Sequence, residues 1–270
     1  MSLQSDIDAL QKWSDMWLLR LNPKKCHVVS LGKIENTMYT MRYKMYGSEM
    51  EHVFEEKDLG VTIDSQLAFE EHITAKVRVA NNMVDLIRRS FSFLDLFRKL
   101  YLALVRPHLE YAQTVWSPHR KKLISMIENV QIRATKLVDG LSNLDYPARL
   151  RKLNIPTLLH RRARGAMIEM YKHFTVYSKE TLSEAFQPRQ RYTRPHNRQI
   201  QARAAKDGVP GVQTNSFYFR NARTWNDLPA DIVNAKTLNS FKNALDRHWE
   251  ELPTTFDHQY RDKERFEEDM

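Results

Sequence analysis

Side chains that commonly perform catalysis are present, but few stand at spacings that would let them act together. Cys26 and His27 are adjacent in a stretch that predicts a strand, where neighbouring side chains point to opposite faces, so they cannot form a nucleophile and its base. Asp6 and Asp8 suggest a carboxylate pair for two metal ions. On a helix, however, positions two apart point about 200° away from each other. Both carboxylates are therefore expected to face solvent.

Motifs for cofactors and metals are also incomplete. His108-Leu109-Glu110 has the spacing of a zinc deaminase, but that site needs a Cys-x-x-Cys partner and the sequence has one cysteine. The seven glycines form neither G-x-x-x-x-G-K-[ST] nor G-x-G-x-x-G, and the ten histidines include no His-x-x-x-His pair. We therefore expect no cofactor and no metal site in this chain.

Positive charge is concentrated in one segment. The formal net charge is +9, and residues 149–206 hold 14 Lys and Arg against three acidic residues, whereas the other residues hold 28 against 30. Such segregation is typical of a protein that binds a polyanion. A solvated helix face followed by a basic loop is the alternative interpretation.

The sequence predicts neither export nor membrane insertion. Its first residues lack a basic region followed by an apolar core, and apolar stretches such as 100–105 are too short to span a bilayer. We expect a soluble, intracellular protein, nuclear or cytoplasmic rather than secreted, with no membrane partner.

The first quarter of the chain mixes helix and strand signals. Apolar residues at helical spacing predict an amphipathic helix over 3–18. Short strands are predicted at 27–31 and 59–63, and a hairpin is predicted from 38–46 and 50–54.

From residue 73 onward the apolar spacing is helical. Helices are predicted over 73–91, 94–105 with an end near Pro107, 119–139 with Gly140 as its C-cap, 146–153, 158–174, and 237–251 with Thr237 as its N-cap. Trp225 and Leu228 are expected in a core, as are Tyr111 and Trp116. In 187–216 the apolar periodicity vanishes, which predicts a basic linker or loop.

Six segments resemble, in order, the C-terminal half of the reverse transcriptase of non-LTR (LINE-type) retrotransposons of the jockey and chicken-repeat kind. Each match is weak alone, and together they cover nearly the whole chain. The segments are LQSDIDALQKWSDMWLLRLNPKKCHVVSLG (3–32), KDLGVTIDSQLAFEEHI (57–73), LYLALVRPHLEYAQTVWSP (100–118), IENVQIRATKLV (127–138), YPARLRKLNIPTLLHRRARGAMIEMYK (146–172) and SFYFRNARTWNDLPADIVNAKTLNSFKNALD (216–246).

The resemblance implies an α+β fold with a small palm remnant, made of a helix and short antiparallel strands, followed by a mainly helical thumb and helical C-terminal region. The implied parts are the palm remnant with a primer-grip-like hairpin (1–72), thumb-like helices (73–118), a basic helical post-thumb region (119–186), the basic linker or loop (187–216) and a small C-terminal module (217–270).

The resemblance also implies what is missing. In the family, an aromatic-Ala-Asp-Asp turn that binds the catalytic Mg²⁺ ions precedes the helix similar to 3–18, and no such motif occurs in this sequence. We therefore expect the chain to be inactive alone as a polymerase, with the missing upstream polymerase segment as a further partner.

The retained palm residues have implied roles. Lys25 matches the family lysine that approaches the pyrophosphate side of the nucleotide, and Asp58, Leu59 and Gly60 match the primer grip. The alternatives are an exposed turn lysine and a plain turn between strands.

Nucleic acid is the implied partner: an RNA template, a DNA primer and the backbone of their duplex. Phosphate contacts are assigned to thumb and post-thumb cations, with Tyr192 and His196 interleaved for stacking. The assigned residues are Arg78, Arg88, Arg89, Arg98, Lys99, Arg106, Arg161, Arg162, Arg164, Arg189, Arg191, Tyr192, Arg194 and Arg198.

The leading hypothesis is a fragment of an RNA-directed DNA polymerase that retains its grip on the primer–template but lacks the catalytic aspartates. Two alternatives remain open at this stage. One is an inactive RNA- or DNA-binding module derived from such an element, and the other is a helical protein-interaction scaffold.

Overall fold

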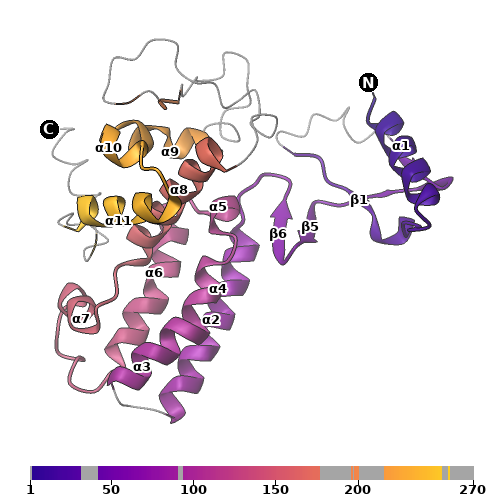
Figure 1. Ribbon diagram of the computed structural model, residues 1–270. Coiled ribbons are helices and arrows are strands. Elements are labelled where there is room, and N and C mark those ends of the chain that lie inside the picture. The colour runs from indigo at the N-terminus through magenta and orange to yellow at the C-terminus, as the bar shows by residue number, and fades with distance from the viewer. Residues whose placement is uncertain are drawn as a thin grey trace, which may run out of the picture. The chain divides into compact units, whose positions relative to one another are not determined.

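A computed structural model describes residues 2–31, 42–90, 94–176, 196, 198–200, 216–250 and 255. The chain divides into two compact units, residues 1–72 and 73–270. The described part of the first unit holds helix α1 and short strands, and that of the second is helical (Figure 1). This mixture agrees with the expected α+β class, while the assignment of palm and thumb stays a prediction.

The first unit contains the predicted N-terminal helix and short strands; residues 38–41 of the predicted hairpin lie outside the described residues. Helix α1 spans Leu3–Met16 and begins at Ser2, whose hydroxyl accepts a hydrogen bond from the Ser5 N–H. A short 3-10 helix follows at Pro23–Lys25. The described strands form three pairs: β1 (His27–Val28) parallel to β4 (Glu51–His52), β2 (Lys44–Met45) antiparallel to β3 (Ser48–Glu49), and β5 (Glu55–Asp58) antiparallel to β6 (Val61–Asp64). The expectation of antiparallel strands is therefore wrong for β1 and β4, which pair across a long connection.

Two glutamines attach α1 to the β2 hairpin. The Gln4 amide donates to the Lys44 carbonyl oxygen and accepts from the Lys44 N–H, each at 2.9 Å, and Gln11 accepts from the Tyr46 N–H at 2.7 Å. Residues seven apart share a helix face, so this contact uses a polar face of α1. The predicted apolar stripe is left exposed; Trp13, for example, is 48% exposed.

The second unit is built from helices of very different lengths, and most lie where the apolar spacing predicts them. They are α2 (Glu70–Ser90), which starts just before the border, α3 (Leu94–Leu100), a π-helical turn (Tyr101–Val105), α4 (Arg106–Glu110), α5 (Gln113–Trp116), α6 (Lys121–Lys136), α7 (Tyr146–Leu153), α8 (Leu158–Thr175), α9 (Phe217–Asn226), α10 (Ala230–Val233) and α11 (Leu238–Trp249).

Two predicted helix ends are wrong. The helix predicted to end near Pro107 continues to Glu110. A proline ring normally crowds the carbonyl one turn earlier, but the preceding turn, Tyr101–Val105, is a wider π-helix that shifts those carbonyls. Helix α6 ends at Lys136, so Gly140 is not its cap and instead takes its positive φ of 74° in the turn beyond.

The C-terminal helices form a second core against α8. Trp225 and Leu228 are buried, as predicted, at 0% and 2% exposure. The ring of Phe241 stacks on Tyr171 of α8 with centroids 4.4 Å apart. Helix α11 is capped by Thr237, as predicted, and Ser240 completes a reciprocal capping box.

A buried polar network joins α6, α7 and α8. The carboxylate of Glu128 on α6 is 0% exposed and accepts three hydrogen bonds. The donors are the Tyr146 hydroxyl at 2.7 Å and the N–H groups of Leu158 and Leu159, each at 3.1 Å. Burial, with the nearby charge of Glu128, raises the pKa of the Tyr146 hydroxyl far above its usual range. Tyr146 therefore stays a hydrogen-bond donor at every relevant pH.

Gln131, one turn after Glu128, extends this network. Its amide donates to the Tyr146 hydroxyl at 2.9 Å and to the Pro156 carbonyl at 3.0 Å, and it accepts from the Tyr101 hydroxyl at 2.7 Å. The π-helical turn that holds Tyr101 is thereby tied to the same centre.

We predict that Tyr146→Phe lowers the free energy of unfolding by about 1–3 kcal/mol, because it leaves one buried acceptor of Glu128 without its donor. The same change at Tyr111, which is 53% exposed, should cost less than about 0.5 kcal/mol. Urea unfolding followed by circular dichroism measures both. Equal losses would show that the buried hydroxyl contributes little.

Candidate nucleic-acid interface

The thumb-like cations of α2 and α3 lie on the protein surface. Arg78, Arg88 and Arg89 of α2 and Lys99 of α3 are exposed. Arg78 and Arg89 are eleven residues apart, which places them on one face of the helix about 16 Å apart along its axis. They form a row of charge suited to a phosphate backbone.

Helix α6 runs beside α2 in the same direction (Figure 1). Thr74 contacts Met126 near their starts, and Arg133 donates to Asn81 at 2.9 Å and to Asp85 at 2.5 Å further along. The C-terminal ends of both helices are therefore neighbours. Arg88 and Arg89 of α2, with Arg133 and the exposed Lys136 of α6, make this end basic.

Arg98 holds the end of α7 in place. Its guanidinium donates to the Leu153 carbonyl at 2.8 Å and to the Asn154 carbonyl at 3.4 Å. The carbonyls at the end of a helix have no N–H partner within the helix, so they accept hydrogen bonds from outside it. Arg151 and Lys152, to which the charge pattern assigned no individual role, are exposed in that last turn. Cations at helix C-termini also interact favourably with the helix dipole, so the positions of Arg151 and Lys152 are explained by helix stability as well as by phosphate binding.

Two of the three arginines of α8 form ion pairs within the protein. Arg161 forms a two-pronged ion pair with Glu110, whose carboxylate also lies 3.6 Å from Arg106, and Arg164 pairs with Asp246 at 2.5 and 2.7 Å.

Arg162, between them, is only 6% exposed. The phosphate contacts assigned to Arg106 and to these three arginines stay a prediction of the sequence alone, because the structure gives them intramolecular positions.

Part of the basic loop also packs inward. Arg189, Arg191, Tyr192 and Arg194 lie outside the described residues. Arg198 donates to the Val233 carbonyl at 2.9 Å.

His196 is 4% exposed, so its predicted place in an exposed stacking surface is wrong. Its Nε2–H donates to the Trp225 carbonyl at 3.1 Å, and its Nδ1 accepts from the Arg198 N–H. The hydrogen bond to the backbone carbonyl of the buried Trp225 holds His196 in the interior.

Trp116, at the end of α5, and Tyr111, just after α4, differ in burial. Trp116 is 1% exposed, as predicted, and its indole N–H donates to the Tyr111 carbonyl at 2.6 Å. Tyr111 is 53% exposed, so its predicted core position is wrong. The backbone leaves the helical conformation at Tyr111, with φ of −57° and ψ of 128°, so the helical spacing that predicted a core position no longer applies there.

In the first unit, the palm-like residues lie at two turns. Lys25 is exposed at the end of the 3-10 helix. Asp58 ends β5, and Leu59 and Gly60 form the two-residue turn to β6 with φ of 45° and 82°. A left-handed leucine is rare in such turns, where Asn or Gly is usual. Leu59 is 83% exposed at the tip of the hairpin.

Among the described residues, no group of three or more His, Cys, Asp or Glu side chains is placed to hold a metal ion. No described helix is both long and apolar enough to cross a membrane.

Comparison with curated proteins places part of this chain beside polymerases of mobile elements. A stretch of 144 residues, 52% of the chain, is 28% identical to the RNA-directed DNA polymerase from mobile element jockey of Drosophila funebris. The chain contains a region related to mobile-element reverse transcriptases. It covers only 16% of that relative's length, so the relative's full activity does not transfer with the match.

Two further relatives are similar in extent. A probable RNA-directed DNA polymerase from transposon BS of Drosophila melanogaster is 26% identical over 141 residues, which is 50% of this chain and 16% of that protein. An uncharacterized protein of Caenorhabditis elegans is 31% identical over 110 residues, 39% of this chain and 56% of that protein. No family model and no solved structure matches the chain.

The buried histidine gives a pH prediction. Burial lowers the pKa of His196 below its ordinary value of 6.5, against an opposing effect of the Trp225 carbonyl, and burial also lowers the pKa of His160 and His173. As the pH falls below about 6.5, these histidines therefore take up protons more readily in the unfolded chain than in the folded chain. Stability from these residues is present above about pH 6.5 and is lost as the pH falls below that value.

We expect His196→Gln to show a smaller loss of stability between pH 7.5 and pH 5 than the unchanged protein, measured as the shift of the urea midpoint. His248→Gln is the control, because His248 is exposed on α11. An unchanged pH dependence in His196→Gln would contradict the neutral state assigned to His196.

Proposed function

We propose that the chain is a reverse-transcriptase-related, nucleic-acid-binding polypeptide that grips a primer–template duplex without carrying out polymerisation itself. The observation that supports this most is the exposure of Arg78, Arg88 and Arg89 on α2 and of Lys99 on α3, in a chain related to RNA-directed DNA polymerases. Contacts of this kind hold phosphates and do not read sequence.

The exposed cations are better candidates for this grip than the arginines of α8. Arg161 and Arg164 already have carboxylate partners, and binding a phosphate would require opening their ion pairs with Glu110 and Asp246. Arg78, Arg88 and Arg89 make no ion pair with another described residue, so they can reach a ligand without breaking one; the ion pair of Asp85 on α2 uses Arg133 of α6.

The exposed apolar side of α1 supports a second candidate function, contact with another polypeptide. Leu10, Trp13 and Trp17 are 47%, 48% and 63% exposed on a helix whose polar face holds the β2 hairpin. In the family that the chain resembles, a polymerase segment precedes the helix similar to α1, and such a segment is the partner that the resemblance implies. Large exposed apolar side chains are suited to such a contact.

We predict that replacing Arg88 and Arg89 with Ala weakens binding to a primer–template duplex. The slope of log K against log salt concentration should fall by up to about 1.8, because each lost phosphate contact removes about 0.9. A fluorescence-anisotropy titration over a range of salt concentrations measures this.

The matched control replaces Lys236 and Arg247, which are exposed near and on α11, and so removes the same charge elsewhere. The control should bind as the unchanged protein does. If both double variants lose the same slope, overall charge explains the binding and the α2 surface does not. An affinity that does not change with salt would favour the protein-interaction scaffold.

A second prediction concerns chemistry. Phosphoryl transfer of this class needs carboxylates that hold two metal ions, and the sequence has no Asp-Asp motif. The 270-residue chain with primer, template, deoxynucleotides and Mg²⁺ or Mn²⁺ should give no primer extension on a sequencing gel. Extension above a control preparation without the chain would overturn the placement of the catalytic aspartates.

A further inference from the structure

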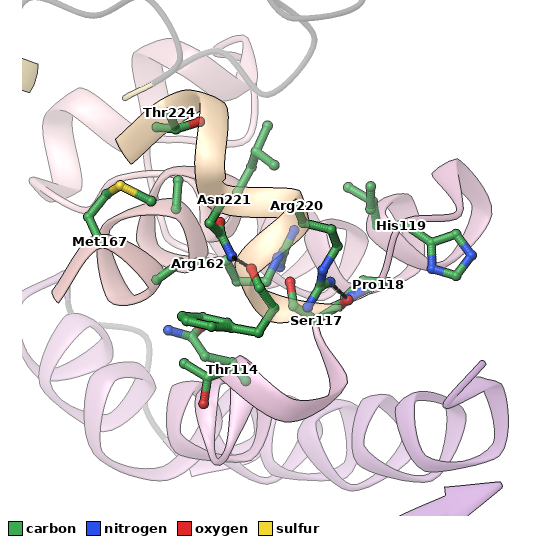
Figure 2. Close-up of a pocket in the computed structure, with 15 residues that line it drawn as sticks. Thr114, Ser117, Pro118, His119, Arg162, Met167, Arg220, Asn221 and Thr224 are labelled. Atoms are coloured by element: carbon green, nitrogen blue, oxygen red, sulfur yellow. Dashed lines mark hydrogen bonds between the residues drawn. The ribbon is translucent and has the colours of Figure 1, made fainter. Parts of the chain in front are cut away.

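A cavity of about 310 Å³ lies between α5, α6, α8 and α9, all within the second unit. Its volume is at the lower end of the range for sites that bind small molecules. Arg162 lines it from α8 and Arg220 from α9, and Thr114 and Ser117 line it from α5 and the residue after it, with Ser117 beside Arg220 (Figure 2). Leu159, Met167 and Phe217 add apolar wall.

The cavity contains buried polar atoms that the protein does not satisfy. Both terminal nitrogens of Arg162, the Nε of Arg220 and the Oε1 of Gln113 are buried, and none has a hydrogen-bond partner in the described part of the chain. Arg220 uses one terminal nitrogen to donate to the Ser117 carbonyl. Unpaired buried donors cost free energy, so a fold that keeps several of them in one cavity is suited to a ligand that pairs them.

The carboxylates whose charge acts most strongly on Arg162, those of Glu128 and Glu110, already have hydrogen-bond partners. Glu128 accepts from Tyr146 and from the first N–H groups of α8, and Glu110 pairs with Arg161. The described lining of the cavity includes no acidic side chain. The cavity is therefore positively charged, and burial lowers the pKa of the Arg162 and Arg220 guanidinium groups because that charge is poorly solvated.

We propose that this cavity binds a small organic phosphate, held by Arg162 and Arg220. Three unpaired guanidinium nitrogens outnumber the two oxygens of a carboxylate and suit the three terminal oxygens of a phosphate monoester. Gln113 offers an acceptor, so the ligand also carries a hydroxyl or amino donor. The apolar wall from Phe217 and Met167 suits a planar base. A nucleotide, free or at the phosphorylated end of a strand, has all of these features.

Isothermal titration of the whole 270-residue chain tests the site with AMP, and with adenosine as the matched ligand without phosphate. AMP should bind at least about tenfold more tightly than adenosine, a difference of about 1.4 kcal/mol. Equal binding of the two, or no detectable binding of AMP, would overturn the proposal. The second result would mean that water alone satisfies the arginines.

The decisive variant is Arg220→Met, with Arg223→Met as its control. Both remove one charge from α9, but the Arg223 side chain is 87% exposed and lies outside the cavity lining. Arg220→Met should weaken AMP binding at least about tenfold, and Arg223→Met should leave it unchanged. Equal effects of the two variants would contradict a specific site.

Gly165→Ala tests the opposite wall without removing charge. A Cβ at this position would come 2.1 Å from Nε2 of Gln113, the movable end of a flexible side chain, so the amide must shift while α8 stays intact. AMP binding should weaken by about threefold or more with an unchanged circular dichroism spectrum. Unchanged AMP affinity would remove Gln113 from the site and contradict the donor requirement.

The site is independent of the duplex-binding surface, and the experiments keep the two apart. Arg88→Ala with Arg89→Ala should leave AMP affinity unchanged, and a loss there would contradict a separate site. Trinucleotides with a 5′-phosphate and with a 5′-hydroxyl distinguish the sources. Tighter binding of the phosphorylated trinucleotide than of AMP assigns the cavity to a strand end, and the reverse assigns it to a free nucleotide.

Discussion

The buried carboxylate of Glu128 is the interaction on which the arrangement of the second unit depends. It lies on α6 and accepts hydrogen bonds from the Tyr146 hydroxyl of α7 and from the first two N–H groups of α8. Burying a lone carboxylate would cost several kcal/mol, but three hydrogen bonds and the positive end of a helix dipole offset that cost. The start of α8 is thereby fixed, and with it the direction in which Arg161, Arg162 and Arg164 point.

That direction explains why charge in the sequence is a poor guide to the surface. The basic segment was predicted to bind a polyanion because its cations outnumber its acids, yet acids distant in sequence pair with two of its arginines in the fold. Glu110 lies 51 residues before Arg161, and Asp246 lies 82 residues after Arg164. Local counting cannot see such pairs. The exposed cations of α2 lie in a stretch whose net charge is unremarkable.

Helical periodicity was informative wherever an apolar stripe met a core. It placed α7 at residues 146–153 and α8 within one residue of its end, and Thr237 was recognisable as a cap because its neighbours obey the capping rule. It failed where tertiary context decides. The π-helical turn before Pro107 has no sequence signature, and the burial of His196 depends on Trp225, which follows 29 residues later. The cavity at Arg162 and Arg220 was likewise invisible, because it joins residues from helices far apart in the chain.

The hydrogen bonds at the start of α8 also have a kinetic meaning. The amide protons of Leu158 and Leu159 are held by a side chain on another helix, whereas most first-turn amides of a helix face water and exchange quickly. They can exchange with solvent only when α6 and α8 separate. The exchange rates of these two amides therefore report how often α6 and α8 separate, and not how often α8 unfolds as a helix.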